Sequence, residues 1–272
     1  MSMTPIRGVA AGVPFVALPP RAGAGAPGLV VAWHLMDPPR SPDAFAGTLP
    51  LADLPAWRVY LELPLHGSRA PAGGPEAFFQ LVVSDAVSNV LEPIVEQAAA
   101  EFPAVLADLR ERFSVRDGPL GLLGGSIGAA VAQLVLAEGD LPVRAAALVS
   151  PVVQLRGMVE VNERMFGMPY TWTAESTAAA DRIDFLARVA DITRRDAAML
   201  IVTGEDDAAF REPAETLHKL LADGSTNCSL VCVPAMGHAL ADEPGVEPDR
   251  PNAAAVRVDA AVTQWFRRHL VS

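Results

Sequence analysis

Apolar runs of strand length alternate along the chain with segments that carry a helical pattern. Most of the runs are continuous, as in strands buried on both faces of a sheet, and they occupy residues 13–18, 28–34, 57–65, 120–125, 143–150, 197–204 and 229–234. Helical patterns occupy 82–113, the stretch from 129 to about 138, and 252–270, the first with expected breaks at Pro93 and near Pro103. This alternation predicts a doubly wound α/β fold with a mainly parallel sheet. Because no internal repeat is visible, we expect a single domain over residues 1–272.

Residues 151–173 depart from this rhythm and carry a set of large apolar side chains. Packing into the core is one explanation, because methionine fills irregular gaps between other side chains. A short lid is the other, since loops beyond the carboxyl ends of parallel strands build the ligand crevice. We favour the lid, and we assign to the substrate pocket Met158, Met165, Phe166, Tyr170 and Trp172.

The composition is that of a globular protein with a large core, since 51% of the residues are hydrophobic and 19% are charged. The net charge of −11 argues against nucleic acid or an anionic membrane surface as a partner. No apolar run has the length of a membrane span, so we expect no membrane partner. Lys219 is the one lysine in a sequence rich in arginine, a bias that indicates a bacterial source with a GC-rich genome.

The cysteines and the N-terminal residues bear on the cellular compartment. Cys228 and Cys232 would lie about 13 Å apart in a strand, which is beyond disulfide reach, so they predict no redox compartment. Residues 7–26 loosely imitate a signal peptide, with Arg7 followed by an apolar stretch and then small residues. Because Pro14 interrupts the apolar stretch, we favour an early strand over residues 13–18 and hence a cytoplasmic protein.

The run Gly124-Gly125-Ser126-Ile127-Gly128 joins the strand at 120–125 to the helix that follows. Gly-x-Ser-x-Gly between a strand and a helix is the pattern of a nucleophile elbow, in which two glycines flank a very sharp turn. The helix then points its N-terminus at the serine, so its N–H groups face a developing oxyanion. Since the pattern fixes only three positions, Ser126 could instead be a simple N-cap; the strand-to-helix context favours the nucleophile.

A serine nucleophile needs a base within hydrogen-bond reach and a group that orients the base. His238 follows the last strand at a loop position beyond its carboxyl end, which favours it as the base. The acid is expected after the strand at 197–204, where three carboxylates follow one another. We favour Asp207 over Asp206 and Glu205, because Asp207 stands three residues after Gly204, the usual distance for a carboxylate that turns back toward the histidine.

The order Ser126, Asp207, His238 resembles that of the α/β-hydrolase family, and the resemblance covers nearly the whole chain. It implies the α/β-hydrolase fold, which has an eight-stranded, mostly parallel sheet with the active site at its carboxyl edge. It also places a small lid at residues 151–173.

The resemblance further implies an oxyanion hole formed by the backbone N–H groups of Ile127 and Met36. Family members usually carry glycine where this chain has Leu35, so this side of the hole departs from the family pattern. We assign the Leu35 side chain to the substrate pocket.

These residues predict a serine hydrolase that transfers an acyl group to water through an acyl-enzyme, without a cofactor. The expected partner is a small-molecule carboxylic ester with a hydrophobic acyl or alcohol group, while thioesters, lactones and amides remain open, as does the oligomeric state. His34, His66 and Asp37 would suit a metal-dependent hydrolase, but no His-x-x-x-His or comparable spacing supports a metal site. A non-catalytic ligand-binding member of the fold is the other alternative, and the three triad positions argue against it.

Overall fold

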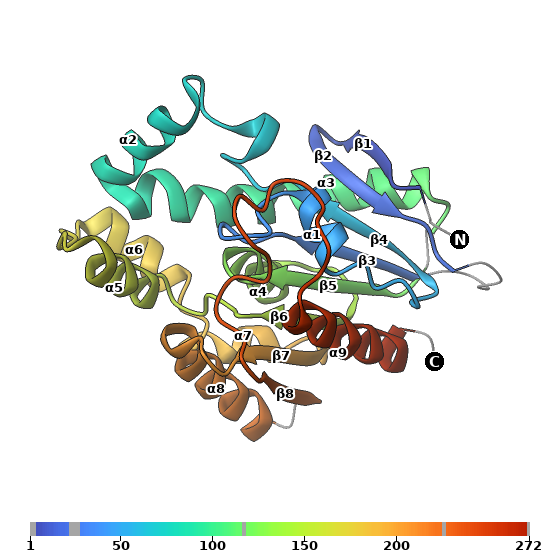
Figure 1. The fold of residues 1–272 in the computed structure, drawn as a ribbon. Helices are drawn as coiled ribbons and strands as arrows, with labels where there is room; N and C mark the ends of the chain where they lie inside the picture. Colours follow the sequence, from blue (N-terminus) through green and yellow to red (C-terminus); the bar gives the residue numbers. More distant parts are fainter. Residues whose placement is uncertain (1–3, 22–27, 116–117, 225–226, 271–272) are drawn as a thin grey trace.

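A computed structural model describes residues 4–21, 28–115, 118–224 and 227–270 of the chain (Figure 1). In the described residues eight strands form one sheet in the order β1-β2-β4-β3-β5-β6-β7-β8. The strand β2 is antiparallel to both of its neighbours, β1 and β4. The other six strands, β3 to β8, run parallel to one another. Their bounds are β1 Ile6–Ala10, β2 Val13–Leu18, β3 Gly28–Trp33, β4 Ala56–Leu61, β5 Leu120–Gly125, β6 Val143–Val149, β7 Ala198–Gly204 and β8 Cys228–Val233. The predicted fold class is therefore confirmed, and β1 is the strand that the sequence pattern did not reveal.

The sheet separates two hydrophobic cores, because successive side chains of a strand point to opposite faces. On β3, Leu29, Val31 and Trp33 pack into one core, whereas Val30 and Ala32 pack into the other. The first core is covered mainly by α3 (Glu92–Arg112), α4 (Ile127–Glu138) and α8 (Ala208–Asp223). The second is covered by α1 (Pro42–Thr48) and α9 (Ala253–Leu270), which lie together on the near side of the sheet in Figure 1. This burial on both faces explains why the strands read as nearly continuous apolar runs.

The long helical pattern before β5 is broken elsewhere than expected. It forms α2 (Gly74–Ala86), a π-helical turn at Val87–Leu91 and α3, and the break lies at Asp85, with φ −165° and ψ 100°. Pro93 fits the first turn of α3, where its missing N–H costs nothing, and Pro103 lies inside α3 without ending it. The predicted break near Pro103 is thus wrong, because core packing of α3 outweighs the hydrogen bond that Pro103 removes, whereas Pro93 lies where the π-helical turn ends and α3 begins.

Helix α2 projects from the body of the protein in Figure 1, and none of its side chains is buried. Phe79 and Val83 are 55% and 51% exposed, so this helix presents an apolar surface to solvent. By length and composition alone the segment Gly74–Arg112 could cross a membrane, but the core helix of a globular protein meets the same criterion.

The connection from β6 to β7 contains three helices, α5 (Leu155–Phe166), α6 (Ala174–Arg182) and α7 (Val189–Thr193). The predicted lid at 151–173 corresponds to α5 and the loop that follows it. A hydrogen bond of 2.5 Å from the Tyr170 hydroxyl to Asp85 Oδ1 ties this loop to the break after α2. The lid segment and α2 therefore flank the same side of the molecule, as Figure 1 shows.

Candidate active site

Ser126 occupies the sharp turn between β5 and α4, with a positive φ of 49° that is rare for a residue other than glycine. The turn brings strand and helix so close that only glycine fits on either side. A Cβ at Gly124 would lie 2.3 Å from the Gly128 carbonyl oxygen, and one at Gly128 would lie 2.3 Å from the Trp33 carbonyl oxygen. The two glycines thus allow the strained serine conformation that the elbow pattern predicts.

The structure brings Ser126, His238 and Asp207 together in one hydrogen-bonded chain. Ser126 Oγ lies 2.8 Å from His238 Nε2, and His238 Nδ1 lies 2.9 Å from Asp207 Oδ2. A carboxylate only accepts hydrogen bonds, so Nδ1 carries the proton and donates to Asp207, which leaves Nε2 free to accept from the Ser126 hydroxyl. Asp207 is buried, and the Phe210 ring stacks on the imidazole at a centroid distance of 4.0 Å. Base and acid are therefore held in the orientation that general-base catalysis requires.

The geometry distinguishes among the three consecutive carboxylates after β7. Asp207 is the one that contacts His238, whereas Asp206 is exposed and Glu205 accepts a hydrogen bond of 3.3 Å from the Ala235 N–H. The same turn also supports the histidine loop, because the Asp206 N–H donates to the Met236 carbonyl at 2.9 Å. The loop after β8 is thus fixed by the turn that carries the acid.

Two backbone N–H groups are available near the serine for an oxyanion. Ile127 is the first residue of α4, and Met36 lies in the turn after β3, half-buried against the first core. Within the described part of the chain, neither N–H donates a hydrogen bond to a protein acceptor. Both remain candidates for the oxyanion hole.

The turn that carries Met36 is fixed by the buried His34. One ring nitrogen, Nδ1, contacts the Leu35 carbonyl oxygen at 2.7 Å, and Nε2 accepts a hydrogen bond of 3.2 Å from the Leu63 N–H. Burial lowers the pKa of His34 to about 3, so the imidazole is neutral. Its protonated Nδ1 donates to the Leu35 carbonyl, and its unprotonated Nε2 accepts from the Leu63 N–H. Since both nitrogens are engaged, neither has a lone pair free for a metal. No group of three or more His, Cys, Asp or Glu side chains with a metal-binding arrangement occurs in the described ranges.

The predicted pocket residues have different environments. Leu35 does not line a pocket, because it is fully buried in the second core, where its side chain fills the space beside Gly125. Met158 is likewise buried in the first core, which agrees better with packing than with a pocket wall. The side chains of Met165 and Phe166 lie outside the described part of the structure.

Tyr170 and Trp172 remain on the surface of the lid segment. Their rings meet edge to face at a centroid distance of 4.9 Å, and the Arg156 guanidinium lies 5.4 Å from the centroid of the Trp172 ring. Burial and the hydrogen bond to Asp85 raise the pKa of Tyr170 to about 12, so its hydroxyl stays protonated and donates. Asp85 was not identified from the sequence, because its partner lies 85 positions away.

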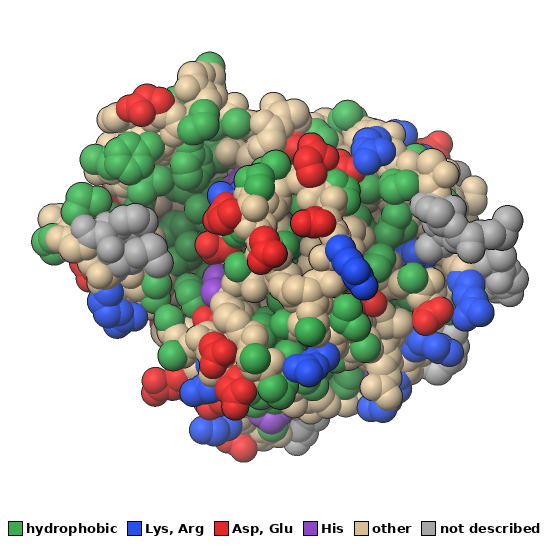
Figure 2. All heavy atoms as spheres, in the orientation of Figure 1, with side chains coloured by type: hydrophobic (Ala, Val, Ile, Leu, Met, Phe, Trp, Pro, Cys, Tyr) green, Lys and Arg blue, Asp and Glu red, His purple; other side chains and the backbone are tan. Residues whose placement is uncertain are grey.

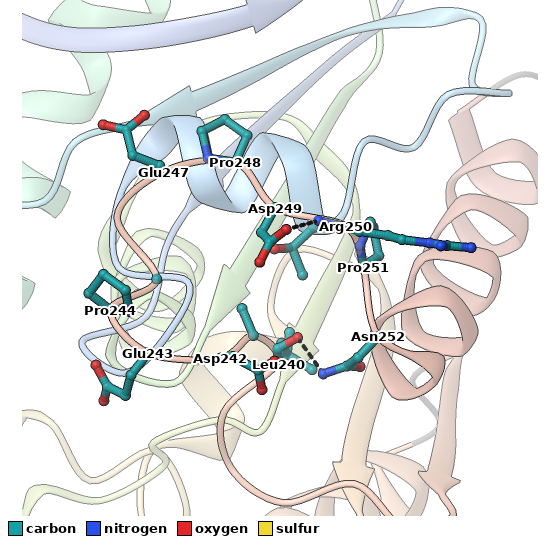
Figure 3. Close-up of a pocket in the computed structure, with 13 residues that line it drawn as sticks. Leu240, Asp242, Glu243, Pro244, Glu247, Pro248, Asp249, Arg250, Pro251 and Asn252 are labelled. Atoms are coloured by element: carbon teal, nitrogen blue, oxygen red, sulfur yellow. Dashed lines mark hydrogen bonds between the residues drawn. The ribbon is translucent and has the colours of Figure 1, made fainter.

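A hollow opens on this face between α2, the lid segment and the loop that follows β8 (Figure 2). Hydrophobic side chains cover its wall on the side of α2, and acidic side chains gather on the rim formed by the loop after β8. Figure 3 shows a separate pocket between this loop and α1, lined by Thr48 and residues 240–245 and 247–252. None of the three triad residues lines that second pocket.

Comparison of the sequence with known families gives a match over most of the chain. The sequence profile of the prolyl oligopeptidase family matches residues 96–272, the segment that contains all three triad residues. No curated protein matches the sequence of the chain.

Solved structures show the same fold at low sequence identity. TT1662 from Thermus thermophilus has a TM-score of 0.65 and 21% identity, over 98% of this chain and 99% of that one. Carboxyl esterase 2 from the fungus Tuber melanosporum has a TM-score of 0.58 and 15% identity, over 99% and 88%. The acylaminoacyl peptidase of Pyrococcus horikoshii has a TM-score of 0.66 and 10% identity, and the match covers 99% of this chain but 42% of the peptidase.

Proposed function

Because the chain belongs to the prolyl oligopeptidase family, a group of serine hydrolases with the α/β-hydrolase fold, we propose that it hydrolyses carboxylic esters through an acyl-enzyme on Ser126. The observation that carries the proposal is the chain of hydrogen bonds from Ser126 Oγ through His238 to the buried Asp207. This arrangement supports the assignment of Ser126 as nucleophile, His238 as general base and Asp207 as the orienting acid.

In the proposed reaction Ser126 Oγ attacks the ester carbonyl carbon while His238 Nε2 takes the hydroxyl proton. The carboxylate of Asp207 stabilises the imidazolium that forms, and the N–H groups of Ile127 and Met36 stabilise the negative charge on the carbonyl oxygen. The intermediate then expels the alcohol, which receives the proton from Nε2. A water molecule, deprotonated by the same nitrogen, then attacks the acyl carbon. Ser126 Oγ leaves with the proton from Nε2, which releases the carboxylic acid and restores the enzyme.

The surroundings of the triad favour a substrate with a hydrophobic acyl or alcohol group. The hollow beside the site has an apolar wall on the side of α2, where Phe79 and Val83 are exposed. The lid segment on the other side carries two aromatic residues, Tyr170 and Trp172, whose rings meet edge to face. Apolar walls of this kind bind a substrate by removing its nonpolar surface from water.

Amide or peptide hydrolysis is the second candidate. The family match and the structural likeness to an acylaminoacyl peptidase favour it, since the same triad can protonate an amine leaving group. An amine is a poorer leaving group than an alcohol and must be protonated as it leaves. Ester and amide hydrolysis would therefore use the same residues and differ in rate.

A substrate series with matched variants tests the proposal. We would measure kcat/KM for 4-nitrophenyl esters of increasing acyl length, for the corresponding thioesters, and for aminoacyl 4-nitroanilides. Ser126→Ala is expected to lower kcat by about three orders of magnitude or more, while Ser229→Ala in β8 leaves it unchanged. Ester hydrolysis that survives Ser126→Ala would show that the nucleophile is wrong, and cleavage of the anilides alone would establish the peptidase candidate instead.

A further inference from the structure

Asp37 places a carboxylate beside the catalytic histidine on the side that faces the substrate. It follows Met36 in the turn after β3, and its Oδ2 lies 3.7 Å from His238 Nε2, the nitrogen that also contacts Ser126 Oγ. Its side chain is 52% exposed, whereas the side chain of Asp207, on the other ring nitrogen, is almost completely buried. Asp207 is thus enclosed within the protein, and Asp37 is accessible to a bound molecule.

The backbone that carries Asp37 is held in place by the loop after His238. The Pro38 carbonyl accepts hydrogen bonds from the Leu240 and Ala241 N–H groups, at 2.9 and 3.3 Å. The Arg40 N–H donates to the Gly245 carbonyl at 2.7 Å. Because these bonds join the Asp37 turn to the histidine loop, the carboxylate is positioned before a substrate binds.

In the described residues the ion-pair partner of this carboxylate is His238, which is charged only when it is protonated. Within the described ranges Asp37 forms no ion pair with arginine or lysine, and the nearby Arg40 is paired with Glu243 at 2.7 Å. Acidic side chains also gather on the rim that the loop after β8 forms, and the exposed Glu247 of this loop points outward in Figure 3, so the rim of the hollow is negative. Such a site attracts a positive group and repels a negative one.

The position of Asp37 relative to the reacting atoms indicates where that positive group lies. The carbonyl carbon of a substrate must approach Ser126 Oγ, which is 2.8 Å from His238 Nε2. Substituents next to the scissile bond then lie within a few ångströms of the same nitrogen, and hence of Asp37. From this geometry we propose that Asp37 selects substrates with an ammonium group next to the scissile ester bond, on the acyl or the alcohol side. The inference rests on the proposed function and names the substrate class for that site.

Two pairs of esters with nearly equal shape test the selection and locate the charge. On the acyl side, L-alanine ethyl ester is compared with ethyl isobutyrate. Near pH 7 the α-amino group of the alanine ester is mostly protonated, whereas the isobutyrate has no charge. On the alcohol side, choline isobutyrate is compared with 3,3-dimethylbutyl isobutyrate. We expect kcat/KM to favour the charged member of one pair by about five- to tenfold, since the carboxylate is partly solvated, and we expect added salt to reduce the preference.

Asp37→Asn should abolish the preference, whereas Asp242→Asn, which removes the same charge from an exposed position on the acidic loop, should preserve it. The pair that shows the effect identifies the acyl or the alcohol side as the position of the charge. A charged-to-neutral ratio that Asp37→Asn leaves unchanged would overturn the inference, and so would an equal loss for both members of each pair. Failure of the proposed function has a different signature, since none of the four esters would then show Ser126-dependent hydrolysis, and both proposals would fall together.

Discussion

Gly204, the last residue of β7, offers a direct test of how the histidine loop is positioned. A Cβ at this residue would lie 2.1 Å from the Met236 carbonyl oxygen and 2.9 Å from that of Gly237, both just before His238. Real Cβ contacts are essentially never shorter than 3.0 Å, so Gly204→Ala requires a shift of at least 0.9 Å (from 2.1 to 3.0 Å) in backbone that is itself fixed by hydrogen bonds. If His238 moves by a similar amount, its 2.8 Å contact with Ser126 Oγ lengthens beyond hydrogen-bond range. We therefore expect kcat to fall about 100-fold, the cost of a 1 Å misplacement in an active site.

The matched control is Gly237→Ala, because a Cβ at Gly237 would meet no atom within 4 Å. Its kcat should stay within about threefold of the wild type, as for substitutions without a steric conflict. Ester hydrolysis by both variants would be compared at a temperature well below the thermal unfolding transition of each, so that lost activity is not confused with lost fold. Wild-type kcat in Gly204→Ala, or an equal loss in both variants, would refute the reasoning that Gly204 sets the position of His238.

Two further predictions concern the acid and the buried histidine. Asp207→Asn should lower kcat by a factor of about 10⁴, because an amide favours the wrong tautomer of the His238 imidazole. The control Asp206→Asn should leave kcat within a few-fold of the wild type. Steady-state kinetics with one ester compares the two variants. His34→Gln should destabilise the protein near neutral pH, because it disturbs two buried hydrogen bonds. The folded-state pKa of His34, about 3, lies below the unfolded value of 6.5, so the unfolded state binds the extra proton between them and wild-type stability falls as the pH decreases through that range. The difference in free energy of unfolding between wild type and variant should therefore narrow by about 1.4 kcal/mol per pH unit below pH 6.5. Urea unfolding near pH 7 and near pH 5.5 measures this difference. A difference that does not change with pH would contradict the assignment of His34 as a neutral, buried histidine.

The strands and the order of the triad could be predicted because both depend on local signals. A strand buried on both faces is a run of apolar residues, and the residues after its carboxyl end face the crevice of a parallel sheet. Ser126 and Asp207 follow such runs at β5 and β7, and His238 follows the apolar edge strand β8. The structure places the three residues in one hydrogen-bonded chain. The parallel sheet therefore brings three residues that are far apart in the sequence close together, and their proximity can be predicted from the strand ends alone.

The break at Asp85, near the end of α2, involves a tertiary contact that the sequence pattern does not carry. The proline rule predicted breaks at Pro93 and again near Pro103, whereas the helix departs from regular geometry at Asp85. The Asp85 carboxylate accepts hydrogen bonds from the Ser88 N–H and from the Tyr170 hydroxyl of the lid segment. Burial alone would raise the pKa of Asp85, but these hydrogen bonds outweigh it and lower the pKa, so the carboxylate is ionised when it holds the lid segment.

The turn after β3 shows most clearly why side-chain roles at the site could not be read from position alone. Leu35 and Asp37 are two residues apart, yet Leu35 fills the core beneath the elbow while Asp37 lies beside His238. What separates them is the path of the backbone, which His34 fixes from within the core and which residues 240–245 fix through hydrogen bonds to Pro38 and Arg40. Those partners lie about two hundred positions further along the chain, so no local pattern reports them. A carboxylate that the sequence indicated only as a metal ligand is for this reason better understood as part of the substrate site, where no described arginine or lysine pairs with it.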